Sequence, residues 1–108
     1  MANAPPQDSA PDVEGLRDAL RTVVDPEAGM NIVDLGLVYR LAIEGDVVRV
    51  DLTMTSPACP VGDMIVEDVE AALRAVLPAR IGTDVALVWS PPWEPAMMSA
   101  EARRHFDW

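Results

Sequence analysis

Lysine is absent from this 108-residue sequence, and cysteine and histidine each occur only once. A single cysteine excludes an internal disulfide and an all-cysteine zinc site within one chain. Proteins without disulfides are typical of reducing compartments, so we expect a cytoplasmic location.

Cationic side chains are few as well: eight arginines face eighteen carboxylates, and the formal net charge is −10. Binding to nucleic acid or to anionic lipid depends largely on clustered cations, and the sequence contains no such cluster. The first eight residues lack the basic and apolar regions of a signal peptide, and no apolar run approaches the length of a membrane span. We therefore expect neither nucleic acid nor a membrane as a partner.

The chain length fits one domain with a real hydrophobic core. Residues 1–8 contain two prolines and no periodic apolar pattern, so they are expected to form a disordered lead-in. Residues 9–108 are expected to form the single folded domain.

Apolar periodicity divides the first half of this domain into four segments. Helical spacing predicts a first helix over residues 10–23, and residues 25–36 then form a structured loop with no clean period. Alternation predicts strands over residues 37–43 and 48–54, which a turn at Gly45 joins into an antiparallel hairpin. The polar face of this hairpin should carry cross-strand pairs among Arg40, Arg49 and Asp51.

The second half continues with a helix between Cys59 and Pro78. Its expected buried stripe is Val61, Ile65, Val69, Leu73 and Val76.

Residues 85–89 form a nearly all-apolar third strand, expected to be central or covered on both faces and parallel to the second strand. Ser99 should cap a short last helix from Ala100 to His105. The fold class is therefore α/β (α+β): a small three-stranded mixed sheet with helices packed on it, in the order helix, strand, strand, helix, strand, plus the short C-terminal helix.

The only cysteine lies where the second strand gives way to this longer helix, within residues 53–60. Pro57 should end the strand, and Pro60 suits the first helical position, which makes Cys59 the expected N-cap. Unpaired backbone N–H groups and the helix dipole favour a thiolate there, as a nucleophile or a soft-metal ligand requires. The alternative is a buried thiol that acts as a small hydrophobe.

Two acidic residues of the 25–36 loop are further candidates, because long loops in compact domains often carry function. Asp25 precedes a proline and could serve only to turn the chain, and Glu27 could be simply solvated. His105 has no partner ligand nearby in sequence, so a surface position in the last helical turn is expected. Trp93 and Trp108 are expected to be packing anchors.

Four blocks of sequence, at residues 25–27, 31–39, 53–60 and 91–103, resemble the SufT/PaaD-like family of iron–sulfur cluster assembly factors in order and spacing. The resemblance runs from about residue 12 to the end. It implies an α/β domain whose site comprises Asp25, Glu27, Thr55, Ser56 and Cys59. The PaaD type adds a cysteine-rich C-terminal segment, and this chain ends at Trp108 without one, so the stand-alone SufT-like type is expected.

The function implied by this resemblance is delivery or insertion of iron–sulfur clusters into client apo-proteins, with carrier and client proteins as partners. Cluster iron is held by about four thiolates in all, so one thiol per chain predicts no tightly bound cofactor. Either a homodimer bridges a labile cluster, with outside thiols or Asp25 and Glu27 completing the shell, or Cys59 docks briefly with a carrier's cluster. The hydroxyls of Thr55 and Ser56 could tune the thiolate.

The alternative from another class is a non-catalytic adaptor that recruits client proteins through its acidic helix and Pro-Trp tail, with Cys59 as structural packing. A thiol enzyme would need a base beside Cys59. His105 is the only histidine, and nothing in the sequence places it there. An enzyme is therefore not expected.

Overall fold

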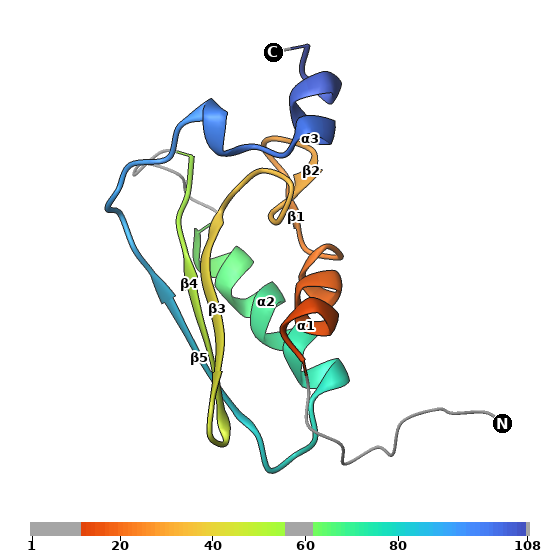
Figure 1. Ribbon diagram of the computed structural model, residues 1–108, viewed down its shortest axis with the longest axis vertical. Helices are drawn as coiled ribbons and strands as arrows, with labels where there is room; N and C mark the ends of the chain where they lie inside the picture. Colours follow the sequence, from red (N-terminus) through yellow and green to blue (C-terminus); the bar gives the residue numbers. More distant parts are fainter. Residues whose placement is uncertain (1–11, 56–61, 108) are drawn as a thin grey trace, which may run out of the picture.

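The computed structural model describes residues 12–55 and 62–107, and its main sheet has the strand order β3-β4-β5 (Figure 1). The strands are β3 (Val38–Glu44), β4 (Val47–Leu52) and β5 (Gly82–Leu87). β3 pairs with β4 antiparallel and β5 pairs with β4 parallel, so the predicted mixed three-stranded sheet is confirmed. The hairpin turn contains Gly45, whose φ of 62° suits glycine.

The third strand differs from its prediction, because β5 lies at the edge of the sheet and β4 is central. Along β5 exposed and half-buried residues alternate, whereas Val48, Val50 and Leu52 of β4 are fully buried. The apolar run of residues 85–89 therefore wrongly predicted a strand that is central or covered on both faces. Its Trp89, which lies beyond the end of the strand, is 46% exposed.

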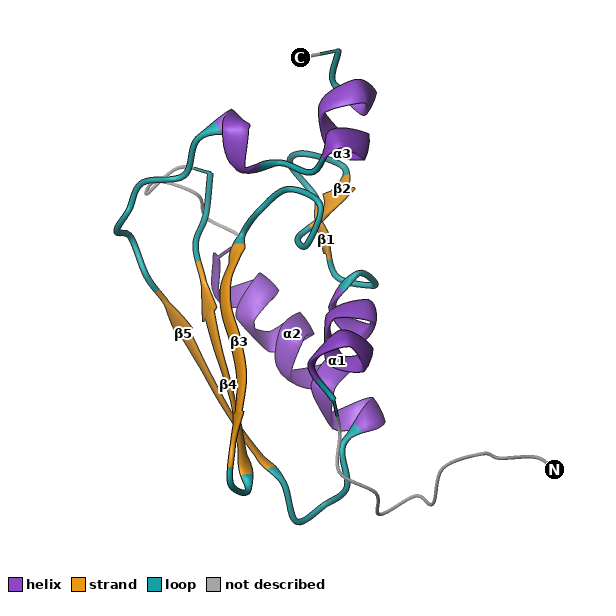
Figure 2. Ribbon diagram, viewed as in Figure 1, coloured by secondary structure: helices purple, strands orange, loops and turns teal. Residues whose placement is uncertain are grey.

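The helices α1 (Val13–Leu20) and α2 (Gly62–Val76) pack on one face of this sheet and on each other (Figure 2). In α2 the exposed face is acidic, and the buried stripe consists of Ile65, Val69 and Leu73. The stripe continues to Leu77, which is 8% exposed, whereas Val76 is 54% exposed. The prediction for Val76 was wrong: the buried positions advance by four residues along α2 to Leu77, and Val76 lies beside this line. Val61 lies outside the described residues.

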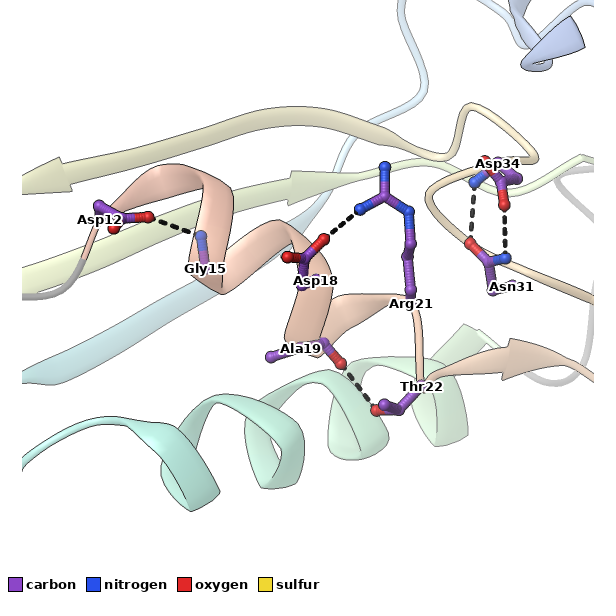
Figure 3. A network of polar contacts seen from close by, with 8 residues as sticks. All are labelled: Asp12, Gly15, Asp18, Ala19, Arg21, Thr22, Asn31 and Asp34. Carbon is purple, nitrogen blue, oxygen red and sulfur yellow. Dashed lines mark hydrogen bonds and ion pairs between the residues drawn. The ribbon is translucent and has the colours of Figure 1, made fainter. Parts of the chain in front are cut away.

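The first helix is shorter than the predicted 10–23. Asp12 is its N-cap, and its Oδ1 accepts a hydrogen bond from the Gly15 N–H at 2.6 Å (Figure 3). At the other end the Thr22 hydroxyl donates to the Ala19 carbonyl at 2.7 Å, which competes with further helical hydrogen bonds. The β-branched residues 22–24 are also poor helix formers.

Within the predicted 25–36 loop the structure places two very short strands, which the sequence did not indicate. β1 (Val24–Asp25) pairs antiparallel with β2 (Met30–Asn31), and Gly29 sits in the connecting turn with a φ of 69°. Asn31 and Asp34 then exchange two hydrogen bonds of 2.8 and 2.9 Å that fix the turn after β2 (Figure 3). The loop is thus held in shape by its own strand pairing and hydrogen bonds.

Residues 90–107, called the C-terminal segment below, cross the upper end of the sheet in Figure 1 and pack on residues 34–39. This segment includes η1 (Pro95–Met97) and α3 (Ala100–His105), and Ser99 caps α3 as predicted. The Ser99 N–H donates to the Asp34 carbonyl at 2.8 Å, and the Tyr39 hydroxyl donates to the Pro91 carbonyl at 2.8 Å. Gly36 is required here, because a Cβ would lie 2.3 Å from the Met97 carbonyl oxygen.

The hydrophobic core lies between the sheet and the two long helices and extends upward to Met98 and Ala102. The opposite face of the sheet, called the outer face below, carries Arg40, Glu44, Arg49 and Asp84. Arg49 contacts both Glu44 and Asp84, and the hydrogen bond with Glu44 is the largest cause of its raised pKa. Arg40 pairs with Glu44 and not with Asp51 opposite, so the predicted cross-strand pairing holds for Arg49 alone.

Candidate functional site

Asp25 is buried at the end of β1, with 1% of its surface exposed. Its Oδ1 accepts a hydrogen bond from the Glu27 N–H at 2.9 Å, and its backbone carbonyl accepts one from the Gly29 N–H at 2.7 Å. A buried carboxylate needs such donors to offset its lost hydration. Asp25 therefore holds the β1–β2 turn together and does not point into solvent.

Glu27 lies in the same turn, and its residue surface is exposed. The backbone N–H of Glu27 is held by Asp25, so the position of this residue depends on its neighbour. The two loop carboxylates thus have different environments, a distinction that their sequence spacing did not indicate.

Thr55 is exposed and lies just beyond β4, where the strand-to-helix corner begins. Together with Ala28 of the β1–β2 turn it lines a cavity of about 240 Å³, called the site cavity below. Among the described residues, Leu35, Trp93, Met98 and Phe106 also line it. The structure therefore brings the acidic turn and the beginning of the corner to one place. Ser56 and Cys59 lie outside the described residues.

The apolar wall of the site cavity comes mainly from segments that the sequence reasoning did not assign to the site. Trp93 packs against the core, and its Nε1 donates a hydrogen bond to the Leu35 carbonyl at 2.7 Å. Met98 is 5% exposed and Phe106 is half-buried. Trp93 is thus a packing anchor, as predicted, and at the same time a wall of the site. Trp108 lies outside the described residues.

Thr53 is buried, whereas the sequence pattern predicted an outward-facing position. Alternation along the predicted strand of residues 48–54 places Thr53 on the same polar face as Arg49 and Asp51, but β4 ends at Leu52 and Thr53 is 1% exposed. Its N–H donates to the Leu37 carbonyl at 2.8 Å, which ties the beginning of the corner to the segment before β3. Strand alternation ceases to predict burial where the strand ends.

His105 lies in the last turn of α3 and is exposed, as predicted, with its ring edge-on to Phe106 at a centroid distance of 4.9 Å. Among the described residues no group of three or more histidine, cysteine, aspartate and glutamate side chains is placed to hold a metal ion. Cys59, the single cysteine of the sequence, lies outside these residues. No helix in residues 12–55 and 62–107 combines the length and apolar character needed to cross a bilayer.

The fold is shared with solved structures. A crystal structure described as a domain of unknown function, DUF59, from Bacillus anthracis matches with a TM-score of 0.79 and 36% sequence identity, over 88% of this chain and 91% of that one. This likeness defines the class as a small α+β domain of the DUF59 type.

Sequence comparison gives the family. Residues 14–86 match the family described as iron-sulfur cluster assembly protein. The Fe-S protein maturation auxiliary factor SufT of Staphylococcus aureus (strain USA300) is 46% identical over 82 residues, which cover 75% of this chain and 92% of that protein. The Fe-S protein maturation auxiliary factor YitW of Bacillus subtilis (strain 168) is 44% identical over 91 residues, covering 83% and 88%. The chain belongs to the iron–sulfur cluster assembly protein family.

Proposed function

We propose that this protein is a cytoplasmic, non-enzymatic maturation factor that helps to deliver or insert iron–sulfur clusters into client apo-proteins. The observation that carries the proposal is the convergence of the β1–β2 turn and Thr55 on one cavity, in a chain of the iron–sulfur cluster assembly family. The two relatives described above are named as maturation auxiliary factors, which supports the same role.

In this proposal Cys59 is the transient cluster ligand or transfer thiol. It follows Thr55 by four positions, so the site cavity lies within a short chain length of the thiol. The cluster is cargo, and its iron requires about four thiolates in all. Release to a client is favoured because one chain supplies only one of them.

The remaining ligands come from outside this chain. In one arrangement two copies bridge a labile cluster, and in the other Cys59 docks briefly with a cluster still held by a carrier protein. Asp25 is an unsuitable ligand as it stands, because its carboxylate is buried and bonded to the Glu27 N–H. Glu27, which is exposed, is the better placed oxygen donor.

Replacement of Cys59 tests the proposed role of the thiol. Cys59→Ser should lower the activity of an iron–sulfur client enzyme, in cells lacking the wild-type chain, to the level without the factor. The purified variant should retain its circular dichroism spectrum and thermal midpoint. Val76→Ser, an exposed change on α2, is the matched control and should support full maturation. Full client activity with Cys59→Ser would remove the thiol from the mechanism.

The burial of Asp25 favours a second candidate, the adaptor, in which the chain recruits clients and binds no cluster. Anaerobic incubation of the full chain with iron and sulfide separates the two. Visible charge-transfer absorbance that Cys59→Ser abolishes supports cluster ligation. Absence of this absorbance, together with full client maturation by Cys59→Ser, supports the adaptor.

A further inference from the structure

Within residues 12–55 and 62–107 no helix packs on the outer face of the sheet, since α1 and α2 both lie on the other side (Figure 2). The charged side chains of this face form a connected set. Glu44 pairs with Arg40 and with Arg49, and Arg49 also reaches Asp84. Both arginines of this face are therefore engaged by carboxylates other than Asp51.

Asp51 is a carboxylate that takes no part in these ion pairs. It sits in β4 with Arg40 and Ala86 as its neighbours in the flanking strands, and it is half-buried. Within the described part of the chain its carboxylate has no ion-pair or hydrogen-bond partner. A half-buried carboxylate in this position can accept two hydrogen bonds from an incoming cation.

Asp51 also lies in the wall of a hollow of about 640 Å³, called the outer hollow here. The other described residues in its wall are Gly36, Val38, Tyr39, Val88, Ser90, Pro91 and Met97. The Tyr39 hydroxyl is fixed by its hydrogen bond to the Pro91 carbonyl and lies 3.3 Å from the Met97 sulfur. The outer hollow thus combines apolar walls, an aromatic ring, a hydroxyl and one unpaired carboxylate.

We propose that the outer hollow binds an arginine side chain that projects from a partner protein. A guanidinium pairs with a carboxylate through two parallel hydrogen bonds, and aromatic rings attract it as well. The three-carbon stem of arginine suits the apolar walls formed by Val38, Val88 and Met97. The net charge of −10 favours approach of a basic segment over an acidic one.

The outer hollow lies next to the site cavity. Gly36 and Met97 line the hollow, whereas their chain neighbours Leu35 and Met98 line the site cavity. An arginine seated in the hollow would therefore hold its parent protein beside Thr55. The binding site itself does not depend on the proposed function, because it follows from Asp51 and the walls of the outer hollow.

The test uses the full chain labelled with ¹⁵N and titrated with N-acetyl-arginine-N-methylamide at low salt. The backbone amide signals of Gly36, Val88 and Ser90 should shift in a saturable way. N-acetyl-norleucine-N-methylamide, which carries a similar stem without charge, should produce no such response. Asp51→Asn should weaken arginine binding by about tenfold or more, because a charge-assisted pair is lost.

Glu70→Gln is the matched control, since it removes an exposed carboxylate on α2, away from the outer face. It should bind the arginine probe as the wild type does, and the spectra of both variants report whether the fold is intact. Three results would overturn the proposal: no saturable shift, equal shifts with the norleucine probe, or undiminished binding by Asp51→Asn. Failure of Cys59→Ser to affect maturation would leave this proposal standing, so the two tests are separate.

Discussion

Asp25, a candidate site residue, has a structural role in the β1–β2 turn. One oxygen of its carboxylate accepts a hydrogen bond from the Glu27 N–H, and its backbone carbonyl accepts one from the Gly29 N–H. This hydrogen bond from a side chain to the backbone two residues on is the pattern of an Asx turn. The burial of Asp25 then follows from the turn closing over its own side chain.

A pair of substitutions separates the structural role of Asp25 from a direct chemical one. Asp25→Ala should lower the free energy of unfolding by about 1 to 3 kcal/mol, because the Glu27 N–H loses its partner. Asp25→Asn keeps an oxygen acceptor and should cost less than half as much. Urea unfolding monitored by tryptophan fluorescence measures both.

Client maturation with the same two variants completes the comparison. If Asp25 acts through the turn, Asp25→Asn should retain most of the activity that Asp25→Ala loses. A stable Asp25→Asn variant that fails to mature clients would instead show that the charge takes part directly.

Among the elements, the C-terminal segment and residues 34–39 depend on each other. The contacts between them include the Ser99 N–H to the Asp34 carbonyl, the Trp93 indole to the Leu35 carbonyl, and the Tyr39 hydroxyl to the Pro91 carbonyl. The segment also supplies Trp93, Met98 and Phe106 to the site cavity. The site cavity is therefore closed by a part of the chain that is far in sequence from Ala28 and Thr55.

Gly36 is the position where this contact between elements is tightest. Gly36→Ala should destabilise the protein by more than about 1 kcal/mol, because a φ of 81° is strained for alanine and its Cβ would clash with the Met97 carbonyl. Gly45→Ala is the control, with a φ of 62° and open space around the added carbon. It should show the strain without the clash.

Thermal unfolding of the two glycine variants gives the measurement, and hydrogen exchange at the Ser99 amide reports the local contact. Gly36→Ala should both lower the midpoint more than Gly45→Ala and speed exchange at Ser99. Equal midpoints for the two variants would mean that the C-terminal segment shifts away at no cost.

At the level of the whole molecule the dominant electrostatic feature is the excess of carboxylates, which gives a net charge of −10. The ion pairs of the described residues are exposed, with side-chain exposures of 41% or more, so solvent screening leaves each of them only a small contribution to stability. Self-repulsion among the remaining carboxylates opposes the compact state. The balance between attraction within the ion pairs and repulsion among the carboxylates decides how salt affects stability.

Added salt should therefore stabilise this protein. Raising sodium chloride from about 10 mM to about 150 mM shortens the screening length from roughly 30 Å to roughly 8 Å, which weakens repulsion between distant carboxylates most. Differential scanning calorimetry at neutral pH should show a higher midpoint in the higher salt. A lower midpoint would indicate that the exposed ion pairs outweigh the repulsion.

The sequence by itself determined the order of the main elements, the mixed sheet and the capped last helix. The elements and the cap are local features, because the period of apolar residues and the capping side chain lie within each segment. The mixed sheet follows from the order of the elements, since a strand–helix–strand crossover makes the third strand parallel to the second. The family resemblance, now confirmed, also came from local blocks of sequence.

Only the tertiary structure decided which strand is central, where Asp25 points and what lines the site cavity. The apolar residues of β5 resemble those of a central strand. The central strand is the one that pairs on both sides, however, and in this sheet that strand is β4. Likewise Trp93, Met98 and Phe106 line the site cavity because the chain returns over residues 34–39. Contacts between residues distant in sequence are set by packing of the whole chain, and no local pattern encodes them.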